Sequence, residues 1–292
     1  MGYARDLPMK ITSTSNPRIQ AALRAVESGE SVLLEGVRAI GEALAAGIVP
    51  TEVFLEGEEE TGGGGIVTAV ETAAERGAAL YFVTSKVLSK LSDLPSARGV
   101  VALAIPPRLS LSDLAPSKQP PSVPLPLSSS SSLFLFLDGI QDPANVGAIL
   151  RSAEAFGAAG VLPTPDCASP FSPKAIRASA LSALRIPIAT GVNPDEAAAW
   201  AAERGAVMAG AETRGGDPPA ILSGIRPLVL VVGSEGHGIS AALESRLSHR
   251  VTIPLSGRVE SLNAAVAAGI LLAFAAGASP QSGSPKTSAE KV

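Results

Sequence analysis

Six short apolar segments alternate with helical segments through the second half of the chain, and this alternation strongly constrains the fold. The predicted strands lie at 133–137, 160–162, 186–188, 206–209, 228–232 and 251–253. Each is almost wholly apolar, which is typical of strands that are covered on both faces in a parallel sheet. The predicted helices lie at 146–156, 173–184, 194–204, 239–247 and 261–276. The pattern therefore predicts an α/β domain built on a parallel sheet.

The first part of the chain carries a second, smaller α/β pattern. Asn16 and Pro17 predict the start of a helix, because proline is favoured at the first helical position. Apolar, β-rich runs follow at 31–34, 51–55, 79–83 and 99–105. Helical segments are predicted at 35–46, 66–76 and 85–91. We expect these elements to form a separate small domain.

Two segments carry no such pattern and divide the chain. Residues 107–132 are rich in Pro and Ser and end in a serine run, so they are predicted to be a linker. Residues 279–292 are polar and are predicted to be a disordered tail. The expected domains are therefore 1–106 and 133–278, both of ordinary size.

Composition excludes several classes of protein. The only cysteine, Cys167, cannot form an internal disulfide, and two histidines leave little for a metal site, so no metal is expected. The longest apolar run, 264–278, is shorter than the roughly 20 residues of a membrane helix, and we expect a cytoplasmic protein without a membrane partner. The net charge of −4 by itself argues against nucleic acid.

Ligands of parallel α/β sheets bind beyond the carboxyl ends of the strands, so the loops there are where site residues are expected. The first such loop, 138–151, contains Asn145 near the start of a predicted helix, where a plain helix cap is the simplest explanation. Arg151 follows among apolar neighbours. It either lies on a solvated helix face or recognises a phosphate group, for which arginine is well suited.

The second and third loops are equally open to two explanations when each is taken alone. The second has the sequence GSEGHG at 233–238, and its glycines permit a close approach of the backbone to a ligand. It matches neither GxGxxG nor a P-loop, and Glu235 could be a simple helix N-terminal charge. In the third loop, Ser261 or Asn263 is expected to cap the apolar helix that follows.

Together, the three loops resemble the motifs of the SpoU (TrmH-like) class of SPOUT RNA methyltransferases. The first motif is present as DGIQDPANVGAILRSAEAFG, the second as LVVGSEGHGIS and the third as IPLSGRVESLNAAVAAG. The stretches SNPRIQAALRA, LLEGVRAIGEAL and ARGVVALA resemble, less specifically, the small ribosomal-protein-like RNA-binding domain that often precedes the catalytic domain. The resemblance implies that 1–106 binds substrate RNA and that 133–278 is the SPOUT methyltransferase domain.

The resemblance carries further expectations for fold and activity. The parallel sheet is expected to contain a deep trefoil knot, and the catalytic domain to form a homodimer. The implied reaction is methyl transfer from S-adenosylmethionine to a ribose 2′-hydroxyl of RNA, with rRNA favoured over tRNA. The implied cofactor-binding residues are Gly233, Ile253 and Leu262. The implied catalytic residues are Asn145, Arg151, Glu235, Ser261 and Asn263.

Chemistry narrows the role of the arginine. The family proposal that Arg151 activates the hydroxyl as a base conflicts with the near-permanent charge of a guanidinium. An alternative is that it anchors a phosphate and stabilises developing negative charge. Leu181 departs from the family pattern, which often has glycine there, and this makes target choice on that side of the molecule less predictable.

Two other functions remain possible on sequence grounds. One is a non-catalytic RNA-binding protein of the same fold, although such a protein would not need all five implied catalytic residues. The other is a dinucleotide-dependent oxidoreductase, which the absence of GxGxxG after the first strand of either domain disfavours. Because no segment is strongly basic, RNA affinity is expected to come from a few placed arginines and from RNA shape.

Overall fold

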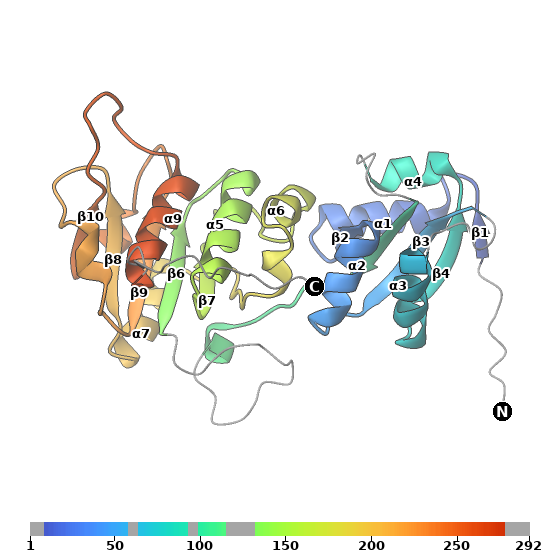
Figure 1. The fold of residues 1–292 in the computed structure, drawn as a ribbon, viewed down its shortest axis with the longest axis horizontal. Helices are drawn as coiled ribbons and strands as arrows, with labels where there is room; N and C mark the ends of the chain where they lie inside the picture. Colours follow the sequence, from blue (N-terminus) through green and yellow to red (C-terminus); the bar gives the residue numbers. More distant parts are fainter. Residues whose placement is uncertain (1–8, 58–63, 93–98, 115–131, 278–292) are drawn as a thin grey trace, which may run out of the picture.

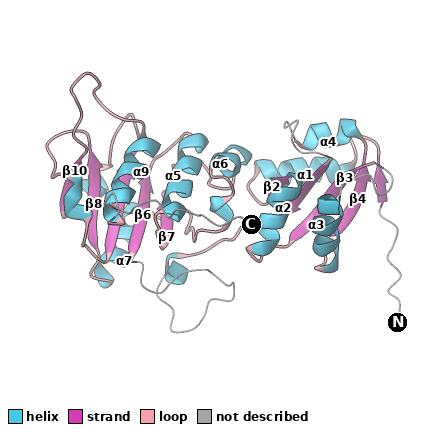
Figure 2. Cartoon of the chain, in the orientation of Figure 1, coloured by secondary structure: helices cyan, strands magenta, loops and turns pink. Residues whose placement is uncertain are grey.

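Two α/β halves lie end to end along the long axis of the molecule (Figure 1). The computed structural model describes residues 9–57, 64–92, 99–114 and 132–277. Each half contains one five-stranded sheet, and helices flank both sheets (Figure 2). Most of the predicted linker and the predicted tail lie outside the described residues.

The sheet of the N-terminal half has the strand order β1-β4-β3-β5-β2. Its strands are β1 (Met9–Ile11), β2 (Val32–Glu35), β3 (Pro50–Glu56), β4 (Ala79–Val83) and β5 (Val100–Ala104). Its helices are α1 (Pro17–Glu27), α2 (Gly36–Ala45), α3 (Gly64–Glu75) and α4 (Ser85–Leu91). Strand β5 runs antiparallel to β2 and β3, and the other pairings are parallel. Only β1 lacked a sequence signal, because it has three residues and two of them are exposed.

The sheet of the C-terminal half is wholly parallel, as the apolar strands predict, and has the order β10-β8-β9-β6-β7. Its strands are β6 (Leu133–Asp138), β7 (Gly160–Pro163), β8 (Val207–Glu212), β9 (Leu228–Gly233) and β10 (His249–Thr252). Its helices are α5 (Pro143–Ala155), α6 (Pro173–Ala178), α7 (Pro194–Glu203), α8 (Ala241–Glu244) and α9 (Ala264–Ala275).

Alternation along the strands builds two separate cores in this half. In β6, Leu135 and Leu137 belong to the core beneath α5, α6 and α9, whereas Phe134 and Phe136 belong to the core beneath α7 and α8. All four side chains are buried. Because successive side chains of a strand point to opposite faces, a continuous apolar run is what such a sandwich requires.

Three predicted elements are wrong or too long. Segment 186–188 forms only an isolated bridge between Val161 and Ile188 and no strand. The predicted helix 173–184 is broken after α6, because Ala180 and Leu181 have φ values of 48° and 69°. This left-handed conformation costs an L-residue about 1–2 kcal/mol and cannot continue a right-handed helix. Predicted helix 239–247 is reduced to the four residues of α8.

The first residues of the predicted linker pack against the C-terminal half. A 3₁₀ turn at Leu111–Leu114 buries the side chain of Leu114 in the core beneath α7. The indole Nε1 of Trp200 donates a hydrogen bond of 3.0 Å to the carbonyl oxygen of Leu111. Composition did not reveal this contact, because isolated leucines among Ser and Asp residues resemble linker sequence.

Ion pairs connect the two halves. Arg177 donates to Glu35 at 3.0 Å. Arg185 binds Glu154 through two hydrogen bonds of 2.7 and 2.8 Å and also contacts Glu42 of α2. Burial opposes ionisation of the Glu154 carboxyl, but the hydrogen bonds and charge of Arg185 lower its pKa overall. The basic side chains of this junction are therefore neutralised within the chain.

Gly147 sets how closely α5 approaches α6. A Cβ atom there would lie 2.5 Å from the carbonyl oxygen of Ala175 and 2.6 Å from Cβ of Ala178. Gly147→Ala is therefore expected to lower the free energy of unfolding by about 1–3 kcal/mol through overpacking. Denaturant unfolding measures the effect.

The matched control is Gly41→Ala in α2, where no atom lies within 4 Å of the added Cβ. At this helix position alanine should stabilise the chain by about 0.5–1 kcal/mol. Equal denaturation midpoints for the two variants would contradict the close packing of α5 on α6.

Candidate functional site

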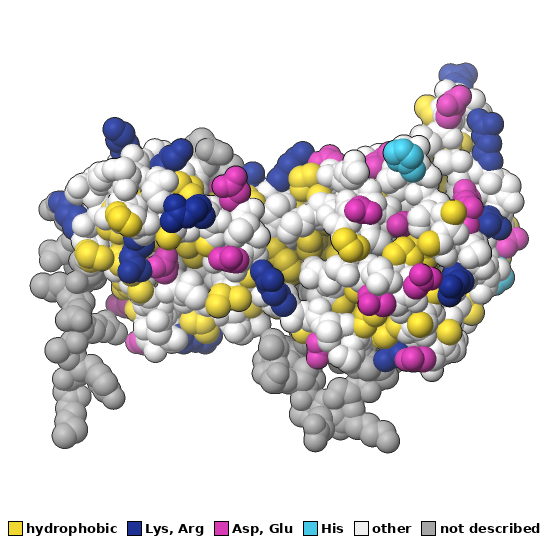
Figure 3. Space-filling model, turned by 180° about the vertical axis from the view of Figure 1, so that it is seen from behind, with side chains coloured by type: hydrophobic (Ala, Val, Ile, Leu, Met, Phe, Trp, Pro, Cys, Tyr) yellow, Lys and Arg dark blue, Asp and Glu magenta, His cyan; other side chains and the backbone are white. Residues whose placement is uncertain are grey.

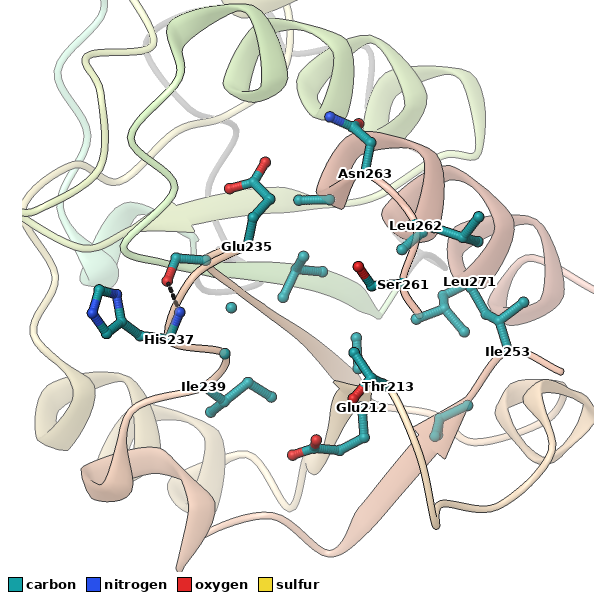
Figure 4. A pocket seen from close by; sticks show the side chains of 18 of the residues that line it. Glu212, Thr213, Glu235, His237, Ile239, Ile253, Ser261, Leu262, Asn263 and Leu271 are labelled. Carbon is teal, nitrogen blue, oxygen red and sulfur yellow. Dashed lines mark hydrogen bonds between the residues drawn. The ribbon is translucent and has the colours of Figure 1, made fainter. Parts of the chain in front are cut away.

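A pocket of about 550 Å³ lies at the carboxyl ends of β8, β9 and β10 and against α9 (Figure 4). Its walls come from the end of β8, from the glycine-rich loop after β9, and from the loop between β10 and α9. The parallel sheet places these segments together because the carboxyl ends of its strands share one edge. The second and third predicted loops therefore form one site.

Backbone geometry makes the loop after β9 compact. A Cβ atom at Gly233 would lie 2.2 Å from the backbone carbon and oxygen of Gly238. Ser234 and Gly238 exchange two backbone hydrogen bonds of 3.1 and 2.9 Å, and the Ser234 hydroxyl accepts one from the His237 amide. Gly238 has a φ of 68°, which glycine adopts without strain. The close approach of residues 233 and 238 therefore requires glycine at position 233.

Asp138 holds this loop against the sheet, a role that its sequence motif did not predict. Asp138 is the last residue of β6, and its buried carboxylate accepts a hydrogen bond of 2.6 Å from the backbone amide of Ser240. The sequence signal that could have identified Asp138 is a carboxylate residue directly after an apolar run. Nearby, the Thr164 hydroxyl and the Cys167 sulfur accept hydrogen bonds from the amides of Gly139 and Ile140.

Three polar side chains, one from each predicted loop, meet beside the pocket. The amide of Asn145 donates to the Glu235 carboxylate, and the amide of Asn263 donates to Oδ1 of Asn145 at 2.9 Å. Asn263 also caps α9, since its Oδ1 accepts from the amides of Ala265 and Val266. The cap predicted for that helix is confirmed.

The expectation that Asn145 is a plain helix cap is wrong. The N-cap of α5 is Asp142, whose carboxylate accepts from the Ala144 amide at 3.0 Å and from Lys174. The Lys174 hydrogen bond is the main cause of a lowered pKa for Asp142. Asn145 is the third residue of α5, and its side chain bonds to Glu235 and Asn263 instead of capping the helix.

The remaining candidates fall into two groups. Gly233, Ile253, Ser261 and Leu262 all line the pocket. Arg151 does not line it; the side chain is exposed on α5 and has no hydrogen bond or ion pair within the described part of the chain. The structure therefore unites every predicted site residue except this arginine.

The charge of the pocket favours a cationic ligand. Glu212, Glu235 and Glu244 line it, and the described lining residues include no lysine or arginine. Apolar side chains such as Leu271 supply the opposite wall. Within the described residues, no group of three or more His, Cys, Asp or Glu residues could hold a metal ion, and no helix is long and apolar enough to cross a membrane.

Two family descriptions match this chain. The SpoU rRNA Methylase family matches residues 132–273, and the RNA 2′-O ribose methyltransferase substrate binding family matches residues 33–110. An uncharacterized tRNA/rRNA methyltransferase of Mycobacterium avium is 34% identical over 274 residues, which cover 91% of this chain and 82% of that protein. One of Mycolicibacterium vanbaalenii is 32% identical, with 87% and 79% covered.

Solved structures agree with these matches. An rRNA methyltransferase from Sinorhizobium meliloti, also solved with AdoMet bound, has a TM-score of 0.78 at 25% identity, covering 92% of this chain and 98% of that one. The SpoU methyltransferase AviRb from Streptomyces viridochromogenes, in complex with the cofactor AdoMet, has a TM-score of 0.73 at 25% identity, with 90% and 98% covered. The chain belongs to the SpoU rRNA methylase family of RNA methyltransferases.

Proposed function

We propose that this protein transfers the methyl group of S-adenosylmethionine to a ribose 2′-hydroxyl of RNA. The observation that carries the proposal is the meeting of Asn145, Glu235 and Asn263 beside a pocket lined by three carboxylates. The family model for 2′-O ribose methyltransferase substrate binding supports the ribose as acceptor.

The pocket suits S-adenosylmethionine in size, polarity and charge. Gly233, Ile253 and Leu262 would hold it, through a glycine backbone that allows close approach and through apolar side chains. When bound, this cofactor supplies an activated methyl group on a cationic sulfonium. The pocket carboxylates favour such a positive charge. The AdoMet complexes of the two related structures support the assignment.

The polar cluster can position the acceptor. A ribose hydroxyl is a weak nucleophile at neutral pH, so it needs alignment and a place for its proton. Glu235 fixes the orientation of Asn145, and Asn145 in turn accepts from Asn263. We assign these side chains, with the Ser261 hydroxyl at the pocket wall, to hydrogen bonding of the RNA ribose or phosphate. Arg151 would anchor a phosphate and stabilise negative charge that develops on the oxygen.

The preferred RNA is proposed to be rRNA, because the C-terminal half matches the SpoU rRNA methylase family. The test incubates the protein and labelled S-adenosylmethionine with rRNA or tRNA from a strain that lacks the gene, followed by nucleoside mass spectrometry. A 2′-O-methylnucleoside in rRNA supports the proposal. Base methylation would contradict the ribose as acceptor, and labelling of tRNA would contradict rRNA as the preferred substrate. RNA binding without methyl transfer would indicate a non-catalytic protein, and binding of NAD in calorimetry would indicate an oxidoreductase.

We further propose that the C-terminal half contains the trefoil knot and forms a homodimer through α9. Val266 and Phe274 lie two turns apart on this helix, and their side chains are 50% and 41% exposed. Exposed large apolar side chains on one helix would be covered in an interface between two copies of the chain. Phe274→Asp is therefore expected to convert a dimer to a monomer, as measured by light scattering after gel filtration.

The control for this substitution is Ile105→Asp, which places the same charge on a 63% exposed apolar residue outside the C-terminal sheet and its helices. It should leave the oligomeric state unchanged. A wild-type protein that is monomeric at all concentrations would refute the dimer, and loss of dimerisation in both variants would refute the role of α9.

A further inference from the structure

Most basic residues of the C-terminal half are neutralised or engaged within the chain. Arg177, Arg185 and Lys174 form the ion pairs described above. The other four engaged residues are Arg204, Arg226, Arg246 and Arg250. A side chain committed in this way contributes little positive field to a polyanion.

These four arginines interact with several kinds of partner. Arg246 pairs with Asp195 at 3.1 Å, and Arg250 lies 4.0 Å from Glu212. The guanidinium of Arg204 lies 4.5 Å above the ring of Trp200 and donates to the carbonyl oxygen of that residue. Arg226 donates to backbone carbonyl oxygens.

Three arginines are exceptions among residues 132–277: Arg151, Arg214 and Arg258. All three are exposed, and none has a hydrogen bond, ion pair or ring contact in the part of the chain that the structure describes. Arg151 is already assigned to the proposed reaction. The other two therefore need a separate explanation.

Arg214 and Arg258 belong to two different loops that border the pocket. Arg214 directly follows Thr213, which lines the pocket after β8. Arg258 lies between the lining residues Leu255 and Ser261, in the loop that stands out between β10 and α9 (Figure 1). Seen from behind, basic side chains are visible on this projecting end of the molecule (Figure 3).

The electrostatics of the pocket explain why free arginines are needed at these places. The lining carboxylates suit a cationic cofactor but repel the phosphates of an RNA strand whose ribose must enter the same site. The chain also has a net charge of −4, so no broad positive field compensates. A guanidinium without an internal partner remains available for bidentate binding of phosphate.

We propose that Arg214 and Arg258 bind the RNA phosphate backbone beside the pocket and hold the strand for methylation. This inference rests on the proposed function, since it takes RNA as the substrate. It assigns RNA recognition to Arg214, which lies outside the three motifs, and to Arg258, which belongs to the third motif. Together they account for how an acidic protein retains an RNA strand.

The test compares full-length wild-type protein with the double variant Arg214→Ala/Arg258→Ala on rRNA from a strain that lacks the gene. KM for RNA is measured over a series of KCl concentrations. We expect the KM for RNA to rise at least about 10-fold, and kcat to fall by a smaller factor. The slope of log KM against log salt should decrease by about 0.7 for each arginine removed, the value for single-stranded contacts. Calorimetry should show the same affinity for S-adenosylmethionine.

The control is Arg246→Ala, which removes one positive charge from the same half, against two in the double variant, at a side chain that is 49% exposed but paired with Asp195. Its KM and salt slope should stay within twofold of wild type. An unchanged KM and slope in the double variant, or an equal effect of the control, would overturn the proposal. If the wild-type protein methylates no RNA, the proposed function fails, and filter binding of the same RNA still tests the two arginines separately.

Discussion

Arg151→Ala is expected to abolish detectable methylation while leaving the affinity for S-adenosylmethionine close to that of wild type. The exposed side chain does not line the pocket, so cofactor binding should not depend on it. Its proposed contact is made with RNA, where loss of one charge-stabilising donor typically costs 100- to 1000-fold in rate. We therefore expect kcat/KM to fall at least about 100-fold.

Two measurements separate this role from a structural one. Calorimetry with S-adenosylmethionine and thermal unfolding should both give wild-type values, because the exposed guanidinium has no partner in the described chain. Arg151→Lys keeps the charge but loses the planar, bidentate geometry, so it should recover only part of the rate. Near-wild-type turnover of the alanine variant would remove Arg151 from the mechanism.

The position of the site was predictable from the sequence, and the reason is topological. Carboxyl ends of parallel strands share one edge, so the loops after β9 and β10 had to lie on the same edge once both strands were recognised, and only β8 separates the two strands. The contact of Asn145 with Glu235 was not predictable in the same way, because an asparagine near a helix start has the same local sequence signal whether it caps the helix or bridges to another loop. Asp142, which precedes Pro143, was the better cap candidate.

The fold errors share a physical cause. Apolar periodicity reports which side chains are buried, but it does not report where the backbone leaves a helix. The run through 173–184 keeps its buried face across the break, with Ile176 and Leu184 in one core, although Ala180 and Leu181 turn the chain. A leucine gives no local warning of a positive φ, whereas a glycine would have done so.

The net charge argued wrongly against nucleic acid as a ligand, for a related reason. A net charge of −4 averages over side chains that neutralise each other and side chains that face solvent alone. Arg185 and Arg177 count as basic residues in the sequence, yet both are committed to carboxylates at the junction of the two halves. Arg258 counts equally and has no such partner in the described chain. Only the pairing pattern distinguishes a structural arginine from one that is available to a ligand.

Gly233→Ala is expected to lower the affinity for S-adenosylmethionine about 100-fold. The added Cβ would stand 2.2 Å from the backbone of Gly238 and 2.5 Å from the Ile239 amide nitrogen, and neither is the end of a flexible side chain. The loop must therefore move at the place where its backbone faces the pocket. Overpacking of this kind costs about 1–3 kcal/mol, and a 100-fold loss corresponds to about 2.7 kcal/mol.

Calorimetry measures the affinity, and thermal unfolding shows whether the domain remains folded. Gly236→Ala is the control for stability, because it adds the same methyl group to the same loop where no atom lies within 4 Å, and it should keep the melting temperature of wild type. Since Asp138 holds the far end of the loop through the Ser240 amide, the displacement should concentrate between residues 233 and 239 rather than spread into the sheet. Wild-type affinity in Gly233→Ala would mean that this loop does not contact the cofactor.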